Sequence, residues 1–297
     1  MDRRLFLKSS GLAAAGGLLL PRWAQAKGFN YQLGLQLYSL NAQMKADPAG
    51  TLKQVAAFGY QDLETYGFNH GGNKFYWNME PATFKSMLQD HNLKTSSGHY
   101  DIDKFLLPGV STDDRRKYVD QCIAGAHILE QQYIVWPWLD PQLRNPEKFH
   151  VLATTLNEIG EQVNKAGLQL LYHNHNFEFE QMNGQLGYDI ILAETDPQLV
   201  KLELDLYWSI RSGQQPEKLF RKQPGRFVVW HIKDMDKENP DLHTYVGNGT
   251  IDFTTITPLA GLSGLQHIFI EQGNNYVPDA LTCVSRSAAF MKQNILR

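Results

Sequence analysis

Cysteine is scarce in this sequence, and neither sign of charge prevails. Only Cys122 and Cys283 occur among 297 residues, both within helical patterns and without metal-ligand spacing. Two buried thiols are the simplest interpretation, which disfavours a disulfide framework and a thiolate metal site. The 28 lysines and arginines nearly balance the 31 aspartates and glutamates, and no basic stripe runs along the chain. We therefore expect no nucleic-acid partner.

Long apolar runs are also missing, except near the start of the chain. The stretch from Gly11 to Leu20 is too short, and too rich in glycine and alanine, to span a bilayer comfortably. It follows a charged segment with Arg3-Arg4 and precedes Ala24-Gln25-Ala26, so it resembles a twin-arginine export signal. We expect cleavage near Ala26 to remove residues 1–26, with the twin-arginine export machinery as a partner and the periplasm as the destination. An uncleaved membrane anchor is the alternative.

The remainder, residues 27–297, has no break in composition and is predicted to form one domain. Eight short apolar runs are continuous rather than alternating, which is typical of parallel strands covered on both faces. No Gly-rich phosphate turn follows the first run, which disfavours a doubly wound open sheet. Helical patterns separate the runs, so we predict an α/β fold, a single-domain (β/α)8 TIM barrel. The predicted strands are Leu33–Leu37, Asp62–Thr65, Lys94–Gly98, Tyr133–Trp136, Leu168–Tyr172, Lys201–Leu204, Phe227–Trp230 and Ile268–Ile270.

Several predicted strands end on a polar group that is expensive to bury alone. Asp205 ends Lys-Leu-Glu-Leu-Asp, His231 ends Val-Val-Trp-His, and Glu271 ends His-Ile-Phe-Ile-Glu. Strand alternation puts Glu203 on the same side as Asp205. A buried carboxylate or imidazole needs a partner, and strand ends of a barrel meet at one mouth. The pattern therefore predicts that these groups converge on one metal ion.

The fifth predicted strand offers more than one further ligand. His173 and His175 share one side of the strand, and Glu178 follows in the loop. A set that mixes carboxylates with imidazoles suits Mn²⁺, Mg²⁺, Co²⁺, Zn²⁺ or Fe²⁺. The residues alone leave open which of these side chains binds the ion.

Two short phrases carry a resemblance to a known family. They are His231-Ile-Lys-Asp234 and Gly247-Asn-Gly-Thr-Ile-Asp252, beside the strand ends described above. Over about residues 30–295 the chain resembles the xylose-isomerase-like superfamily, which includes sugar phosphate isomerases, ketose 3-epimerases and inosose dehydratases. The resemblance implies a barrel that holds one divalent ion on Glu, Asp, His and Glu.

Carried over residue by residue, the resemblance implies four metal ligands. Asp205, His231 and Glu271 match the family pattern, whereas the fifth strand lacks the expected Glu. Glu178 is taken as the fourth ligand, with His173 or His175 as the competing assignment and Glu180 as a weaker one. Mn²⁺ is the expected ion among the five candidates. Glu178, Glu271 and His175 are the predicted acid and base groups.

Other polar and aromatic side chains on the predicted rim are candidate substrate contacts. Trp136 and Trp138 flank Pro137 and could stack on a sugar face, although rim packing is an equal alternative. The full set of predicted substrate contacts is Glu64, His99, His173, Lys233 and Trp136.

These features predict a metal-dependent sugar isomerase or epimerase that works through an enediolate on a keto-sugar or keto-polyol. A lyase or dehydratase that eliminates a group beta to the carbonyl is the first alternative, and export favours it because phosphorylated sugars are scarce outside the cytoplasm. A non-catalytic sugar-binding barrel is the second alternative. The sequence leaves the sugar open, and also whether the chain forms a homo-oligomer.

Overall fold

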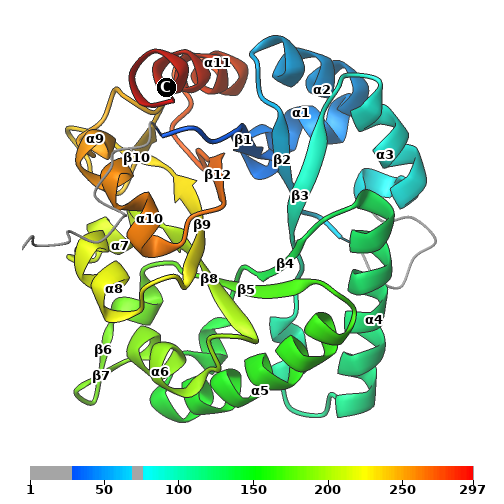
Figure 1. The fold of residues 1–297 in the computed structure, drawn as a ribbon, viewed down its shortest axis with the longest axis vertical. Helices are drawn as coiled ribbons and strands as arrows, with labels where there is room; N and C mark the ends of the chain where they lie inside the picture. Colours follow the sequence, from blue (N-terminus) through cyan, green and yellow to red (C-terminus); the bar gives the residue numbers. More distant parts are fainter. Residues whose placement is uncertain (1–28, 69–75, 297) are drawn as a thin grey trace, which may run out of the picture.

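Eight parallel strands close into a barrel in the computed structural model, which describes residues 29–68 and 76–296 (Figure 1). Around the barrel the order of strands is β1-β12-β9-β8-β5-β4-β3-β2, and β2 pairs with β1 to close it. The predicted α/β barrel is therefore confirmed, while the predicted export signal lies outside the described residues. The strands are β1 (Leu33–Gln36), β2 (Asp62–Thr65), β3 (Lys94–His99), β4 (Tyr133–Trp136), β5 (Gln169–His173), β8 (Val200–Asp205), β9 (Phe227–Ile232) and β12 (His267–Ile270).

Helices follow the strands and cover the outside of the barrel (Figure 1). The longest, α5, begins where the Asn145 side chain accepts a hydrogen bond from the Lys148 N–H, with Pro146 in its first turn. It ends before Gly167, whose φ of +78° suits a residue without a side chain. The helices are α1 (Asn41–Ala46), α2 (Pro48–Ala57), α3 (Pro81–Gln89), α4 (Thr112–Leu129), α5 (Pro146–Lys165), α6 (Gly187–Glu194), α7 (Leu206–Arg211), α8 (Pro216–Lys222), α9 (Phe253–Ile256), α10 (Ala260–Ser263) and α11 (Ala280–Phe290).

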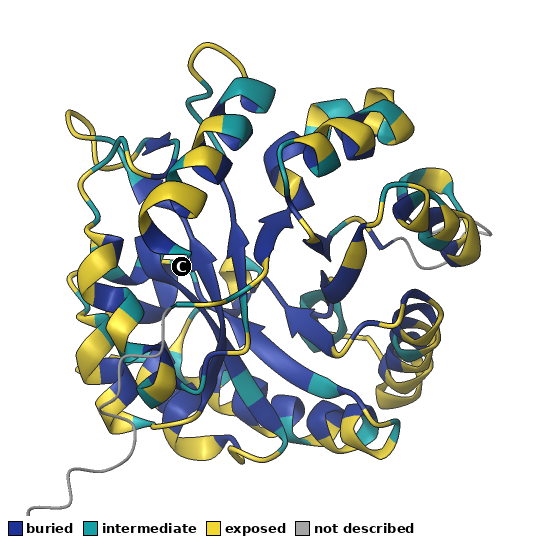
Figure 2. Cartoon of the chain, turned by 45° about the horizontal axis from the view of Figure 1, so that its top comes forward, coloured by how far each residue is buried: buried dark blue, intermediate teal, exposed yellow. Residues whose placement is uncertain are grey.

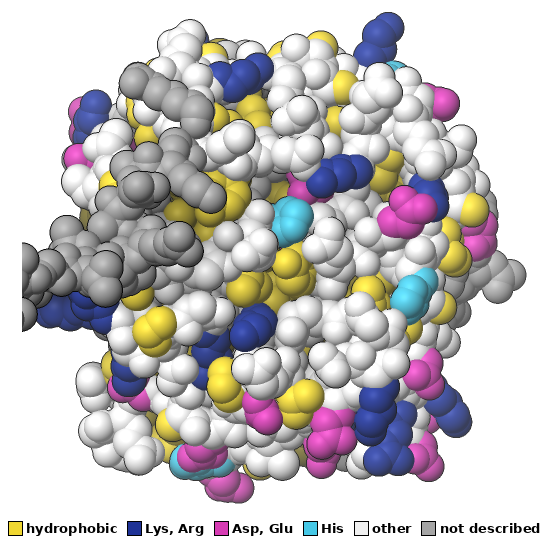
Figure 3. Space-filling view, in the orientation of Figure 1, with side chains coloured by type: hydrophobic (Ala, Val, Ile, Leu, Met, Phe, Trp, Pro, Cys, Tyr) yellow, Lys and Arg dark blue, Asp and Glu magenta, His cyan; other side chains and the backbone are white. Residues whose placement is uncertain are grey.

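Burial follows the layers of the fold (Figure 2). The strands are buried on both faces, whereas the outer faces of the helices are exposed. The two cysteines are buried and free, as expected, in α4 and α11. Among the described residues, none of the helices is both long and apolar enough to cross a membrane. Charged side chains of both signs are scattered over the face drawn in Figure 3.

A layer of apolar side chains fills the interior of the barrel below its carboxyl-terminal mouth. Leu171, Val229 and Phe269 are all fully buried and belong to one cluster of apolar side chains. Side chains two residues further along a strand point to the same side. His173, His231 and Glu271 therefore lie one layer above these three apolar residues, at the carboxyl ends of β5, β9 and β12.

Two short hairpins interrupt the alternation of strands and helices, and neither was predicted. β6 (Gln181–Met182) pairs with β7 (Gln185–Leu186), and β10 (Asp234–Met235) pairs with β11 (His243–Thr244). Each strand of these hairpins has two residues, which is too short for a period-two pattern to be read from the sequence. The second hairpin follows β9 and so lies beside the mouth of the barrel.

Candidate active site at the mouth of the barrel

Polar side chains from several strand ends meet at the carboxyl-terminal mouth. Asp205 ends β8, His231 lies near the end of β9, and Glu271 follows β12 directly. One ligand atom from each of the three lies within 4.8 Å of the others. The structure therefore brings together three of the four predicted metal ligands.

Lys233 joins this group from the same side of the chain as His231. Its Nζ lies 2.8 Å from Asp205 Oδ2 and 3.0 Å from Glu271 Oε2, and the side chain is 3% exposed. Burial alone would lower the pKa of Lys233, but the charges of Asp205 and Glu271 raise it above its ordinary value. The predicted substrate contact is therefore a charged ammonium group between two carboxylates.

His231 is held between two carboxylates. Its Nδ1 lies 2.8 Å from Glu271 Oε2, and its Nε2 lies 2.6 Å from Glu64 Oε2. Glu64 also accepts hydrogen bonds from Gln36 Nε2 at 2.7 Å and Ser97 Oγ at 2.6 Å. Burial would raise the pKa of Glu64, yet the nearby imidazoles hold it well below its ordinary value. Glu64 thus lies beneath His231 as its fully buried partner, and not on the open rim where a substrate contact was predicted.

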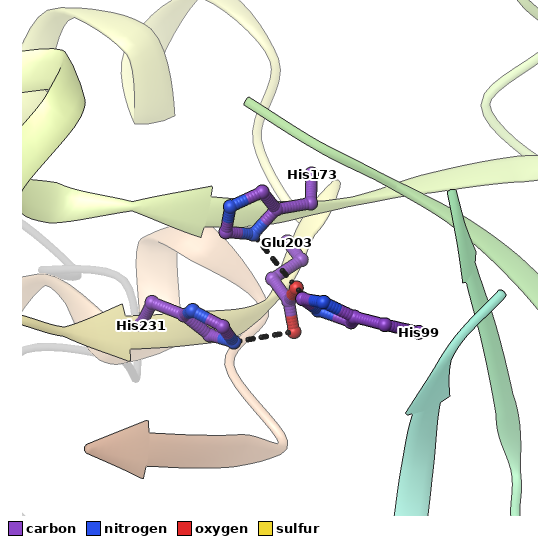
Figure 4. A group of neighbouring side chains, drawn as sticks. All are labelled: His99, His173, Glu203 and His231. Atoms are coloured by element: carbon purple, nitrogen blue, oxygen red, sulfur yellow. Dashed lines mark hydrogen bonds and ion pairs between the residues drawn. The ribbon is translucent and has the colours of Figure 1, made fainter. Parts of the chain in front are cut away.

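A second group of potential ligands shares His231 (Figure 4). It comprises His99, His173, Glu203 and His231. Glu203 Oε2 lies 2.8 Å from both His99 Nε2 and His173 Nδ1, and Glu203 Oε1 lies 3.3 Å from His231 Nε2. The pKa of Glu203 is raised by burial and by the charge of Glu64. Predicted as a rim contact, His99 instead packs inward, with its side chain 13% exposed.

Glu178 is not part of either group. This residue is fully buried and lies in a short 3-10 turn, Phe177–Phe179, that follows β5. Its Oε1 accepts a hydrogen bond from Tyr172 OH at 2.8 Å, and its Oε2 accepts one from the His175 N–H at 2.8 Å. Burial raises the pKa of Glu178 to about 7. The carboxylate therefore holds the loop after β5 in place, and both of its oxygens are engaged there and not with the other three predicted ligands. Glu180 is exposed.

His173 occupies the position beside Asp205 that was predicted for Glu178. Burial lowers the pKa of His173 well below its ordinary value, so the ring is neutral. With Glu203 as a carboxylate, Nδ1 carries the proton and donates to it. The lone pair of Nε2 then remains, 3.9 Å from Asp205 Oδ2. This matches the competing assignment for the fifth strand, an imidazole ligand.

The residues at the mouth fit a divalent cation. Asp205 Oδ1 caps α7 by accepting the Trp208 N–H at 3.0 Å, whereas its buried Oδ2 accepts no aligned hydrogen bond. Two imidazoles each have a carboxylate on the nitrogen opposite the mouth, Glu203 for His173 and Glu64 for His231. Such a carboxylate fixes the ring tautomer and raises the basicity of the ligating nitrogen. Asp205, His231 and Glu271 could therefore hold one ion, with His173 Nε2, 3.9 Å from Asp205 Oδ2, as the candidate fourth ligand.

The rim beside this group is aromatic. The His175 ring lies 5.0 Å from Trp138 and 4.9 Å from His173, and its buried Nδ1 has no partner among the described residues. Trp138 is 41% exposed, whereas Trp136 is fully buried in the core. Trp136 Nε1 donates to the Trp138 carbonyl at 2.6 Å, so it supports the loop and offers no face to a ligand. Of the two tryptophans, only Trp138 can stack on a substrate.

The two family-like phrases of the sequence form one unit. Asp234 is buried and accepts backbone N–H groups from Gly247, Gly249 and Ile251 at 2.9, 3.0 and 3.1 Å. A Cβ at position 249 would lie 2.2 Å from Asp234 Oδ1, so only glycine fits there. The carboxylate thus fixes the loop before α9 to the chain directly after Lys233.

Two polar residues of the mouth were missing from the predicted site. Glu203 shares a side with Asp205 in the predicted strand, and that alternation was the signal that could have found it. His243 lies on β11, with its Nδ1 accepting the Gly273 N–H at 2.9 Å. It belongs to a long connection without periodicity, so the sequence held no local signal for it.

The amino-acid sequence is similar to that of a known protein family and of characterised relatives. The model of the xylose isomerase-like TIM barrel family matches residues 52–293. An inosose dehydratase from Lacticaseibacillus casei is 26% identical over 232 residues, which cover 69% of this chain and 74% of that protein.

Solved structures share the fold over nearly the whole chain. A sugar phosphate isomerase/epimerase from Parabacteroides distasonis ATCC 8503 is 26% identical, with a TM-score of 0.78 over 92% of this chain and 97% of that one. A xylose isomerase-like TIM barrel protein from Mycobacterium smegmatis, solved in complex with magnesium, has a TM-score of 0.66 over 91% of this chain and 98% of that one. At 15% identity this last likeness concerns the fold alone.

Proposed function

Because the chain belongs to the xylose isomerase-like TIM barrel family, we propose that it is a divalent-metal-dependent enzyme that moves a proton beside a carbonyl group. Its substrate in this proposal is a keto-sugar or keto-polyol. Delivery of a proton from the opposite face gives an epimerase, and delivery of a proton to the neighbouring carbon gives an isomerase.

One observation carries the proposal. Asp205, His231 and Glu271 converge within 4.8 Å at the mouth, and buried Lys233 lies between the two carboxylates. Burying so many charged groups together lowers the stability of the fold, so stability does not explain their presence. Such a group of charges is typical of a site that binds a cation and a polar substrate.

The proposed ligands are His173, Asp205, His231 and Glu271. When bound, a divalent ion supplies positive charge. This charge would stabilise the negative charge that develops on the carbonyl oxygen as the neighbouring carbon loses its proton. Two imidazoles with two carboxylates suit Mn²⁺, Fe²⁺, Co²⁺ or Zn²⁺ better than Mg²⁺, and we propose Mn²⁺ among them. The M. smegmatis protein in complex with magnesium supports a divalent ion in this fold.

Proton transfer is assigned to side chains around the ion site. His175 has a buried Nδ1 without a partner, next to Trp138 on the rim, and takes the proton from carbon. Glu178 acts indirectly, since its carboxylate accepts the His175 N–H and so positions that residue. Lys233 donates a hydrogen bond to a substrate oxygen.

Elimination is the second candidate function. Once the carbon beside the carbonyl has lost its proton, the substrate can instead expel a hydroxyl or alkoxy group beta to the carbonyl. The enzyme is then a dehydratase or lyase. The relative from L. casei is an inosose dehydratase, and it covers 69% of this chain. This relationship favours elimination on a keto-polyol or a 3-keto-glycoside.

Export is part of the proposal. Residues 1–26 would direct the folded protein through the twin-arginine machinery to the periplasm, with the ion acquired beforehand. Expression with and without Arg3-Arg4 replaced by Lys-Lys, followed by cell fractionation, tests this directly. Equal amounts of both forms in the periplasm would exclude that route.

Solvent isotope exchange tests the function. The Mn²⁺-loaded protein is incubated in D₂O with free ketoses, inososes and 3-keto-glucosides, and proton NMR follows each carbon. Deuterium at the carbon beside the carbonyl supports proton transfer, and the products separate an epimerase or isomerase from a lyase. If the sugars bind without any exchange, the protein is a sugar-binding barrel and the proposal fails.

A further inference from the structure

Several buried polar atoms around the proposed ion site accept or donate no well-aligned hydrogen bond, although Asp205 Oδ2 and Glu203 Oε1 each face a charged or imidazole group. Among the described residues they include His175 Nδ1, Glu203 Oε1, Asp205 Oδ2 and His243 Nε2. A buried polar atom left without a hydrogen bond costs about 1–3 kcal/mol. The ion accounts for Asp205, the nearby His231 Nε2 accounts for Glu203, and the proton-transfer role accounts for His175. Neither accounts for His243.

The backbone of His243 is fixed at both ends by the segment after Glu271. Its N–H donates to Asn274 Oδ1 at 2.7 Å, and its carbonyl accepts from Asn275 Nδ2 at 2.9 Å. The ring is fixed as well, because Nδ1 accepts the Gly273 N–H at 2.9 Å. A nitrogen that accepts a hydrogen bond carries no proton, so the proton of the neutral ring is on Nε2. His243 is therefore a rigid donor whose direction is set before any ligand arrives.

This donor lies beside the charged groups of the mouth. The Trp208 ring lies 6.0 Å from the His243 ring and 5.8 Å from Lys233 Nζ. A Cβ placed on Gly273 would lie 3.3 Å from the His243 ring and 4.0 Å from Glu271 Oε1. His243 thus lies close to Lys233 and Glu271, with Trp208 and Gly273 between them.

We propose that His243 donates a hydrogen bond from Nε2 to an uncharged hydroxyl group of the substrate, and thereby selects unphosphorylated polyhydroxy ketones. This inference rests on the proposed function, since it concerns the substrate of the same site.

The charges around His243 favour a hydroxyl group over a phosphate. The positive charge of Lys233 is offset by its ion pairs with Asp205 and Glu271. Burial, aided by the charge of Lys233, lowers the pKa of His243 to about 3, so the ring stays neutral. A phosphate needs cations or several aligned donors, whereas a hydroxyl group is satisfied by a single neutral N–H.

Calorimetry with unreactive polyols tests the inference apart from turnover. Wild-type Mn²⁺-loaded protein is titrated with myo-inositol, sorbitol and their phosphate monoesters, beside the variants H243L and H243Q. We expect H243L to bind the preferred polyol about tenfold more weakly and H243Q, which keeps an N–H donor, to stay within about threefold of wild type. H150L, at a surface histidine paired with Glu194, is the matched control and should bind as wild type.

A second measurement needs no variant. Nitrogen-15 NMR of labelled histidines in the wild-type protein should show His243 protonated at Nε2, with that resonance shifting when the polyol binds. The inference is overturned if H243L binds as wild type, if a phosphate ester binds more tightly than its parent, if no polyol binds at all, or if Nδ1 carries the proton. Polyol binding with these histidine effects but without deuterium exchange would instead overturn the proposed function alone.

Discussion

Replacement of Asp205 separates its role as a helix cap from its role as a metal ligand. Asp205 Oδ1 caps α7 at 3.0 Å from the Trp208 N–H, and Oδ2 faces Lys233 Nζ at 2.8 Å. Asparagine caps a helix about as well as aspartate, whereas alanine loses about 1 kcal/mol. Both changes remove the carboxylate from the mouth. We therefore expect D205A to be about 1 kcal/mol less stable than D205N in the absence of metal.

The lost ion pair affects both variants equally. Breaking a buried pair costs about 3–5 kcal/mol when the remaining charge is left alone. Lys233 keeps Glu271 at 3.0 Å, so the loss should be smaller, about 1–3 kcal/mol. Urea unfolding of the metal-free proteins measures this term.

Metal binding then distinguishes the two roles. At an Mn²⁺ concentration of about 100 times its Kd, the wild-type free energy of unfolding should rise by about 2.7 kcal/mol. Neither D205N nor D205A should gain more than a small part of this at the same concentration. A D205N protein stabilised by Mn²⁺ as strongly as wild type would show that Asp205 is only a cap, and the proposed ligand set would be wrong.

Four further variants test residues in and beside the mouth of the barrel. E203Q removes the carboxylate behind His173 and should weaken Mn²⁺ binding about 10- to 100-fold by calorimetry; unchanged affinity would show that Glu203 does not support a ligand. The pKa of Glu178 is raised by burial to about 7 from 4.5. The folded protein therefore holds this proton more tightly than the unfolded chain, and stability should fall by about 3 kcal/mol as the pH rises from about 4.5 to 7. In urea unfolding, E178Q should lose most of this decrease in the free energy of unfolding with pH. An unchanged pH dependence in E178Q would show that another group causes it. W136A should lose about 3–5 kcal/mol of stability as a core truncation, whereas W138A should lose much less and instead weaken sugar binding; the reverse pattern would return the stacking role to Trp136.

Most of the barrel could be predicted because its strands are short, apolar and buried on both faces. β2 and β4 have the predicted bounds, and β9 was predicted two residues too short, since it runs on through His231 to Ile232. The polar residues at the ends of such strands break the apolar pattern. A strand predicted from hydrophobicity therefore ends before the functional residue. The hairpin that carries His243 has two-residue strands and no pattern to read.

The candidate site was predictable only where a strand fixes the side chain. Asp205, His231 and Glu271 each lie on or directly after a strand, and alternation decides which way they point. Glu178 lies within a 3-10 turn, where alternation no longer applies, and its carboxylate accepts the His175 N–H. Trp136 closes β4 as a fully buried residue, although aromatic residues near a rim suggested a sugar platform.

Anomalous diffraction from crystals grown with Mn²⁺ would locate the ion at the mouth of the barrel. We expect a single peak within bonding distance of Asp205, His231 and Glu271, with His173 Nε2 as the fourth protein ligand. A peak bound by Glu178, or no peak at this mouth in protein that still exchanges deuterium into a keto-sugar, would contradict this expectation.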